Sequence, residues 1–184
     1  MDKVKKGEIM IVNRVDVDKF KETVEKARKD PATGKKTMEV EGEWRLNKTG
    51  PQFESRIKTE KGGEIVLQSD ETLILGGGGS APNPVQYCIY GLIACYAATF
   101  AKWAALEGIL LKAFKIKATS NMDLTGAFGV TQNPILEKLK WEMIVDTDAG
   151  MEKLDKLNEI AKERCPGYYC VTHEIIPEIK IIKQ

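Results

Sequence analysis

The stretch Gly76–Phe100, GGGGSAPNPVQYCIYGLIACYAATF, determines the fold that we expect for this chain. A glycine run and two X-Pro steps lead into an apolar segment that carries no charge until Lys102. Glycine and proline mark turns, and a long apolar run rich in Ala, Leu and Ile is typical of a buried helix. We therefore predict a long helix from about Pro84 to Glu107, with Cys88 and Cys95 on roughly the same face.

The alternative for this helix is a membrane span, because its uncharged part approaches the roughly 20 residues that cross a bilayer. Gln86, the tyrosines at 87 and 90, Gly91 and the absence of a basic flank at the start of the segment favour a core helix instead. A chain of 184 residues with 42% hydrophobic and 30% charged residues has the composition of one soluble globular domain.

The charge balance excludes some partners. Lys and Arg number 28 against 27 Asp and Glu, so the net charge is +1 and no global field attracts nucleic acid or an anionic membrane.

The N-terminal stretch MDKVKKGEIMIVNRVDVDKFKE lacks the apolar core and the cleavage site of a secretory signal. We expect a cytoplasmic protein, in which four cysteines indicate catalytic, metal-binding or core roles rather than a disulfide framework.

The remaining periodicity predicts an α+β fold. Helical spacing of apolar residues predicts helices at 16–30, with Asp16 or Asp18 as its cap, and at 149–165. Alternation of apolar and polar residues predicts strands that include an antiparallel meander before the long helix and a closing strand. The predicted strands are 38–46, 53–60, 64–69, 109–124, 135–146 and 173–182.

Four interpretations of the cysteines remain open. A free cysteine is most often a small core hydrophobe. A structural zinc site is disfavoured by the spacing of the thiols, and the one histidine, His173, supplies no cluster. A thioredoxin-type site lacks its C-x-x-C motif. A two-thiol redox centre needs a positive neighbour to form the thiolate and a second thiol to resolve the sulfenic acid. Because Cys95 lies well inside its helix, an arginine would have to lower its pKa.

Two motifs resemble those of the OsmC/Ohr family of thiol-dependent peroxidases. They are the glycine-rich turn with Pro-Asn-Pro and a small-residue helix containing Ala-Cys, and the later string AKERCP at 161–166. The resemblance covers residues 38–184, which leaves 1–37 as an N-terminal helical extension. It implies the OsmC-like fold, in which strongly curved antiparallel sheets surround long central helices in an intertwined homodimer with two active sites at the subunit interface.

The resemblance also assigns site residues by position. Cys95 matches the peroxidatic cysteine and Cys165 the resolving cysteine. Arg56 is the better match, and Arg45 the weaker, for the arginine that favours the Cys95 thiolate. The family's glutamate, which holds that arginine, falls at one of two adjacent positions that are here Val85 and Gln86.

Gln86 can accept a hydrogen bond from the arginine but carries no charge, so this chain departs from the family at that point. Cys88 is a further departure, which is either core filling or a second redox thiol. The sequence assigns no role to Cys170.

The implied reaction is reduction of an organic hydroperoxide without a bound cofactor or metal. The Cys95 thiolate attacks the peroxide, Arg56 stabilises the developing charge, Cys165 forms a disulfide with the oxidised Cys95, and an external dithiol reductant regenerates the pair. Two alternatives remain. The missing glutamate favours a non-catalytic or small-molecule-binding member of the fold, and the Cys95 thiol is also compatible with a sulfur carrier that holds a persulfide on Cys95.

Overall fold

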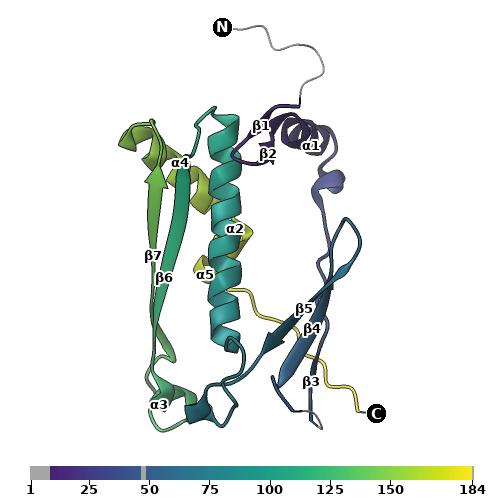
Figure 1. Cartoon of the computed structure of the whole chain (residues 1–184), viewed down its shortest axis with the longest axis vertical. Helices are drawn as coiled ribbons and strands as arrows, with labels where there is room; N and C mark the ends of the chain where they lie inside the picture. The colour runs from purple at the N-terminus through teal and green to yellow at the C-terminus, as the bar shows by residue number, and fades with distance from the viewer. Residues whose placement is uncertain (1–8, 47–48, 184) are drawn as a thin grey trace, which may run out of the picture. The chain divides into compact units, whose positions relative to one another are not determined.

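The structure is a computed structural model that describes residues 9–46 and 49–183 (Figure 1). The chain forms two compact units by packing. One, the core unit, comprises the residues up to Val24 and from Leu92 onward, and the other, the sheet unit, is Glu25–Gly91. The boundary predicted at residues 37 and 38 stays a prediction.

The core unit is built on an antiparallel ladder of β6 (Ala113–Met122) and β7 (Leu136–Asp146), as the alternation predicted. Packed with the ladder are the part of α2 (Pro84–Leu106) from Leu92 onward and α4 (Met151–Arg164). Apolar side chains alternate with lysines along β6, so one face of the ladder meets the helices and the other meets solvent. The ring of Phe100 in α2, for example, lies 5.0 Å from that of Phe114 in β6.

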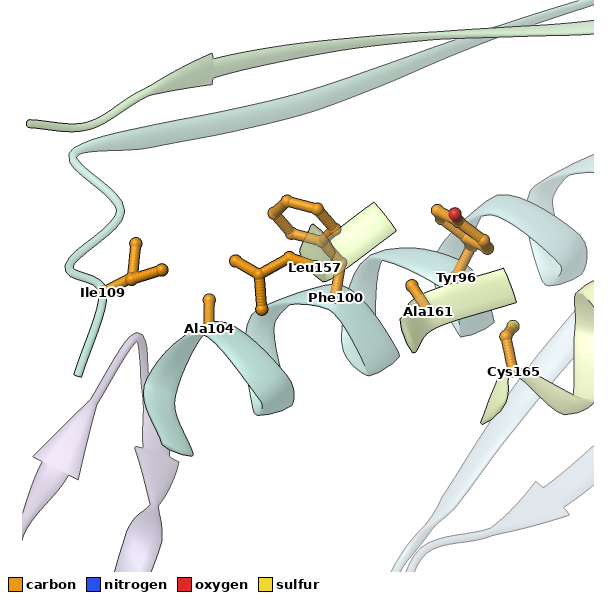
Figure 2. Close-up of a cluster of buried hydrophobic side chains, with 7 residues drawn as sticks. All are labelled: Tyr96, Phe100, Ala104, Ile109, Leu157, Ala161 and Cys165. Atoms are coloured by element: carbon orange, nitrogen blue, oxygen red, sulfur yellow. The ribbon is translucent and has the colours of Figure 1, made fainter. Parts of the chain in front are cut away.

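Two helices supply most of the core at a spacing of four residues, which is the repeat of one helix face (Figure 2). Ala104 and Ala161 are fully buried, and their small side chains allow close packing of the neighbouring elements. The buried cluster consists of Tyr96, Phe100, Ala104, Ile109, Leu157, Ala161 and Cys165. Leu157, Ala161 and Cys165 lie on one face of the helix predicted at 149–165, where helical spacing of apolar residues was expected.

A short hairpin begins the described chain. Strands β1 (Ile11–Val12) and β2 (Val15–Asp16) are joined by Asn13 and Arg14, both with positive φ (51° and 63°), as in a type I′ turn. The Asn13 amide holds the segment after α2: its Nδ2 donates to the carbonyl oxygen of Ile109 and its Oδ1 accepts from the N–H of Leu111, both at 2.9 Å. The sequence did not predict this hairpin.

Helix α1 (Val17–Lys29) follows and confirms the predicted helix at 16–30. Asp16 caps it by accepting the backbone N–H of Lys19 at 2.9 Å. Val17 is buried, and the ring of Phe20 contacts that of Trp103 edge to face at 6.0 Å.

The sheet unit contains the predicted meander, with β3 (Gly42–Trp44), β4 (Phe53–Lys58) and β5 (Glu64–Ser69) antiparallel in that order. Strand β3 is shorter than the predicted 38–46. Trp44 in β3 is 54% exposed and Met38 before the strand is 91% exposed, because little covers these side chains within the described part of this unit. Two short 3₁₀ helices, η1 (Pro31–Gly34) and η2 (Leu73–Leu75), flank the sheet.

A buried aspartate anchors the glycine run that precedes α2. Asp70, at the end of β5, accepts hydrogen bonds from the N–H and hydroxyl of Ser80 (2.9 and 2.7 Å) and from the N–H of Gly78. These bonds hold the pKa of Asp70 below its usual value. A Cβ at Gly78 would lie 2.9 Å from the Asp70 carboxylate, so glycine permits this close turn.

Helix α2 confirms the predicted long helix at Pro84–Leu106. In the part of the chain that the structure describes, it is the one helix whose length and composition would allow it to cross a membrane. Its buried residues from Tyr96 to Ala105 pack in a protein core with α4 and the β6–β7 ladder. This packing agrees with the core-helix interpretation of the sequence.

The predicted closing strand at 173–182 is wrong. Residues 174–183 form neither helix nor strand, and the apolar side chains there are exposed, Ile181 at 92%. Alternation gives a segment the pattern of a strand, but a strand also needs a neighbour to accept its hydrogen bonds.

Two short helices were missed, α3 (Leu124–Ala127) and α5 (Pro166–Thr172). Pro166 does follow the end of α4, as predicted, but it also occupies the first turn of α5, where proline needs no N–H partner.

Candidate functional site

The structure brings two sequence-predicted cysteines together inside the core unit. Cys95 lies on α2 and is half-buried, whereas Cys165 lies between α4 and α5 and is only 1% exposed. Their Sγ atoms, 70 residues apart in sequence, are 3.6 Å apart. A disulfide is about 2.05 Å long, so the sulfurs need to approach by about 1.5 Å to form one.

The first turn of α5 holds both sulfurs. The N–H of Gly167 donates to Cys95 Sγ and the N–H of Tyr168 donates to Cys165 Sγ, each at 3.4 Å. A Cβ at position 167 would lie 3.0 Å from Cys95 Cβ and 3.3 Å from the carbonyl oxygen of Leu92. Gly167 thus allows α5 to approach α2 closely. The Cys-Pro-Gly string at 165–167 is a sequence signal that could have predicted this turn.

Burial raises the pKa of the Cys95 thiol, and the neighbouring Cys165 raises it further. The Gly167 N–H and the charge of Lys102 act in the opposite direction without reversing the shift. Within the core unit alone, Cys95 is therefore mainly a protonated thiol at neutral pH. Nucleophilic chemistry at this sulfur needs a further positive group.

Three aromatic rings of the core unit pack against one another, and two of them belong to residues near the cysteines in sequence, Tyr96 next to Cys95 and Tyr168 three residues after Cys165. The ring of Tyr96 lies 5.2 Å from that of Trp141 and 5.9 Å from that of Tyr168. The Tyr96 hydroxyl donates to Asn158 Oδ1 at 2.7 Å, and burial raises the pKa of Tyr96 to about 12. Tyr96 is thus a neutral hydrogen-bonded group rather than an acid or base.

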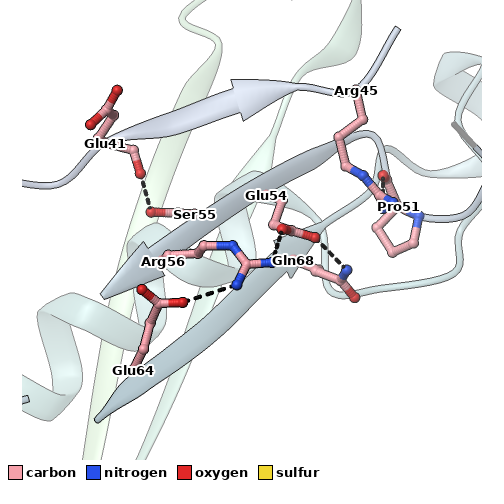
Figure 3. Close-up of polar contacts among 8 residues, drawn as sticks. All are labelled: Glu41, Arg45, Pro51, Glu54, Ser55, Arg56, Glu64 and Gln68. Atoms are coloured by element: carbon pink, nitrogen blue, oxygen red, sulfur yellow. Dashed lines mark hydrogen bonds and ion pairs between the residues drawn. The ribbon is translucent and has the colours of Figure 1, made fainter. Parts of the chain in front are cut away.

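Arg56, the better sequence match for the active-site arginine, lies exposed on β4 of the sheet unit (Figure 3). Its guanidinium donates to Glu64 at 2.9 Å and to Glu54 at 3.0 Å. Glu64 and then Glu54 raise the pKa of Arg56. The positive charge of Arg56 is therefore already balanced by two carboxylates on its own sheet.

Arg45, the weaker match, is in a different environment directly after β3. It is half-buried and donates from Nη1 to the carbonyl oxygen of Pro51 at 3.2 Å. Its Nε is buried and has no hydrogen-bond partner among the residues that the structure describes. Buried donors are normally satisfied, so an unpaired guanidinium N–H is a group with binding capacity to spare.

Gln86, which stands where the family has its glutamate, takes part in starting α2. Its Oε1 accepts the N–H of Asn83 and its own N–H donates to Asn83 Oδ1, both at 2.9 Å. This reciprocal pair is a capping box, and Asn-x-x-Gln before an apolar run is a sequence signal that could have revealed it. The neighbouring Val85 is half-buried.

The other two cysteines, Cys88 and Cys170, are exposed, so neither fills the core of its own unit. His173 is exposed as well and stacks on Tyr169, with ring centroids 3.9 Å apart. Within residues 9–46 and 49–183, no group of three or more His, Cys, Asp or Glu side chains is arranged to hold a metal ion.

Residues 77–180 match the sequence model of OsmC-like proteins, which is more than half of the chain. This chain belongs to the OsmC-like family. A comparison with curated proteins finds no match.

Solved structures support the OsmC-like fold. An OsmC-like protein of unknown function from Vibrio cholerae superposes with a TM-score of 0.56 at 14% identity, over 79% of this chain and 100% of that one. An OsmC-like protein from Mycoplasma pneumoniae gives 0.54 at 13%, over 74% and 87%. An organic hydroperoxide resistance protein from V. cholerae, with captopril in one of its active sites, gives 0.51 at 19%, over 75% and 87%. At these identities the likeness concerns the fold.

Proposed function

We propose that this OsmC-like protein is a thiol-dependent peroxidase that reduces organic hydroperoxides through Cys95 and Cys165. The observation that carries the proposal is the 3.6 Å separation of the two sulfurs, with Cys95 the more accessible and Cys165 buried. This is the arrangement expected of an attacking and a resolving thiol. The fold is also shared with an organic hydroperoxide resistance protein.

In the proposed reaction, the Cys95 thiolate attacks the terminal oxygen of the hydroperoxide and the O–O bond breaks. The alkoxide takes a proton and leaves as the alcohol, and Cys95 becomes a sulfenic acid. The Cys165 sulfur, having lost its proton, then attacks the Cys95 sulfur, and hydroxide leaves as water while the disulfide forms. An external dithiol reduces the disulfide by exchange.

The raised pKa of Cys95 makes an arginine necessary for this reaction. The family resemblance favours Arg56 as that arginine. The surroundings favour Arg45, because Arg56 already has two carboxylate partners whereas Arg45 has a buried unpaired N–H. Gln86 is the proposed neutral partner of the arginine, through the second lone pair of its Oε1.

We further propose that the protein acts as an intertwined cytoplasmic homodimer. Large apolar side chains of the sheet unit, Trp44 and Met38 among them, are exposed, and so is Tyr90 on α2. A soluble chain rarely leaves such groups uncovered, and a second copy would cover them.

Peptide mass spectrometry after a stoichiometric pulse of cumene hydroperoxide tests the function. We expect rapid loss of two hydrogens that maps to a Cys95–Cys165 disulfide, and complete loss of peroxide consumption in Cys95→Ser. Cys165→Ser should still consume one equivalent and stop at a sulfenic acid. The exposed Cys170→Ser is the matched control and should behave as wild type. If Cys95→Ser removes peroxide as fast as wild type, the peroxidase proposal is wrong.

A second candidate, a small-molecule-binding member of the fold, is favoured by the absence of the family's glutamate at Val85 and Gln86. In that case all four thiols remain reduced after the peroxide pulse. A persulfide carrier, the third candidate, would instead gain the mass of one sulfur on Cys95 when incubated with a low-molecular-weight persulfide, whose outer sulfur passes to the Cys95 thiolate while the donor thiolate leaves.

A further inference from the structure

The core unit contains a cavity that the proposed peroxidase reaction does not use. Its volume is about 430 Å³, within the range of small-molecule sites. Its walls come from β7 (Leu139, Trp141 and Met143), from α4 (Asn158 and Lys162) and from α5, which contributes Tyr168. We propose that this cavity binds an apolar carboxylate, with its chain against the β7 side chains and its carboxylate on Lys162.

The β7 wall suits an apolar ligand body. Leu139, Trp141 and Met143 alternate along the strand, so all three side chains project from the same face. They are half-buried, which leaves part of their apolar surface to be covered. A chain of about eight carbons would cover this apolar surface, and removing apolar surface from water favours binding.

Two polar groups of the cavity, the Lys162 ammonium and the Asn158 amide nitrogen, can only donate, which favours an anionic or carbonyl head group. None of the described lining residues is acidic. The Tyr96 hydroxyl bonds to Asn158 Oδ1, so the amide nitrogen of Asn158 is left as a donor. The indole N–H of Trp141 is buried and has no partner among the described residues.

Lys162 is the one cationic side chain among the described lining residues, and it shares its charge with a single carboxylate, that of Glu159. Its ammonium bonds to Glu159 at 2.7 Å, which raises the pKa of Lys162 and keeps it protonated. One such bond uses one of its three N–H donors, so two remain for a ligand carboxylate. The side chain of Lys162 is partly exposed, which provides a route for the head group to enter.

Tyr168 connects this cavity with the thiol pair. It lines the cavity, and its N–H donates to Cys165 Sγ at 3.4 Å. Formation of the Cys95–Cys165 disulfide shortens the separation of the sulfurs by about 1.5 Å and so displaces the first turn of α5. Ligand affinity and redox state are then coupled reciprocally. This coupling rests on the proposed peroxidase function, whereas ligand binding does not.

Calorimetric titration of the reduced protein with octanoate, and with octan-1-ol as the uncharged match, tests the site. We expect saturable binding of octanoate, binding at least tenfold weaker for octan-1-ol, and a similar loss in Lys162→Met. Lys153→Met, an exposed lysine of the same helix outside the cavity, is the control and should bind as wild type. Trp141→Phe, which shortens the apolar β7 wall, should weaken binding of octanoate and octan-1-ol alike.

Three results would overturn the proposal: no saturable heat with octanoate, equal binding of octanoate and octan-1-ol, or unchanged binding in Lys162→Met. Sedimentation of the same samples shows whether a second copy of the chain covers the cavity. In that case octanoate would bind only when the dimer dissociates. Repeating the titration after oxidation with cumene hydroperoxide tests the coupling, with an expected change in affinity of threefold or more. If no disulfide forms but octanoate still binds the reduced protein, the peroxidase proposal fails and the binding site stands.

Discussion

The core unit and the sheet unit differ in how complete each is. In the core unit, Cys95 and Cys165 already contact each other, and buried side chains such as Phe100 surround them with close packing. In the sheet unit the apolar side chain of Trp44 faces solvent and the guanidinium N–H of Arg45 lacks a partner among the described residues.

The difference indicates that the two requirements of the proposed chemistry, contact between the sulfurs and formation of the Cys95 thiolate, are met by different parts of the protein. The sulfur-to-sulfur geometry is a property of one packed unit, whereas activation of the sulfur requires more positive charge than Lys102 supplies among the described residues of this unit. The sheet unit offers arginines and uncovered apolar surface, which are features of a surface that functions in an assembly.

The largest effect is expected in the core. Phe100→Ala removes a ring that is 1% exposed and should lower the free energy of unfolding by about 3–5 kcal/mol. Val66→Ala on β5, 44% exposed, should cost less than about 1 kcal/mol. Urea unfolding followed by circular dichroism measures both. Equal costs would show that the two units are packed alike, contrary to the comparison.

The next effect concerns assembly. Trp44→Arg places a charge on the exposed apolar face of β3 and should weaken the proposed dimer by about 30-fold, the size expected for loss of a buried interface tryptophan. Analytical ultracentrifugation across a dilution series measures this, and an unchanged circular dichroism spectrum would show that the fold is intact. Lys58→Glu, a charge change at the end of β4, is the control. A wild-type chain that sediments as a monomer would refute the assembly.

The pH dependence of Cys95 identifies the arginine. When the activating arginine is removed, the raised pKa set by burial remains, so less thiolate exists at pH 7 and alkylation requires higher pH. Arg45→Met should move the rate–pH profile of Cys95 alkylation upward by about one unit, which is about tenfold in rate at pH 7. Arg56→Met should move it less. The reverse order would assign the role to Arg56, and no shift in either variant would remove arginine from the mechanism.

The smallest effect is expected at the turn that holds the sulfurs. Gly167→Ala adds a Cβ 3.0 Å from Cys95 Cβ, so α5 and α2 must separate by a few tenths of an ångström. We expect disulfide formation to slow several-fold while the first oxidation of Cys95 keeps its rate. Rapid-quench mass spectrometry separates the two steps. Gly150→Ala, where an added Cβ meets open space, is the control.

Much of the fold could be predicted from periodicity. The long helix, the three-stranded meander, the β6–β7 ladder and α4 were expected because each has a repeat of two or of about 3.6 residues over many positions. The β1–β2 hairpin was missed because its strands have two residues each and its turn is Asn13-Arg14 rather than Asn-Gly. The strand expected at 173–182 failed because alternation does not specify a pairing partner.

The candidate site was predictable in its residues but not in its contacts. Cys95 and Cys165 were paired by family resemblance, and no spacing rule places thiols 70 residues apart next to each other. The family pattern singled out Gln86 because it lacks the charge of the expected glutamate. Its hydrogen bonds with Asn83 in the capping box were not predicted. The different surroundings of Arg45 and Arg56 depend on strand register, which sequence alone specifies weakly.

The Asn13 clamp has a consequence for the order in which a ribosome produces the parts of this protein. Its two backbone partners, Ile109 and Leu111, lie 96 and 98 residues downstream. At about 5–20 residues per second, the hairpin leaves the ribosome roughly 5–20 s before the segment it binds has been synthesised. During that interval the hairpin lacks the two backbone partners that Asn13 binds, so this early segment depends on the arrival of residues 109–111.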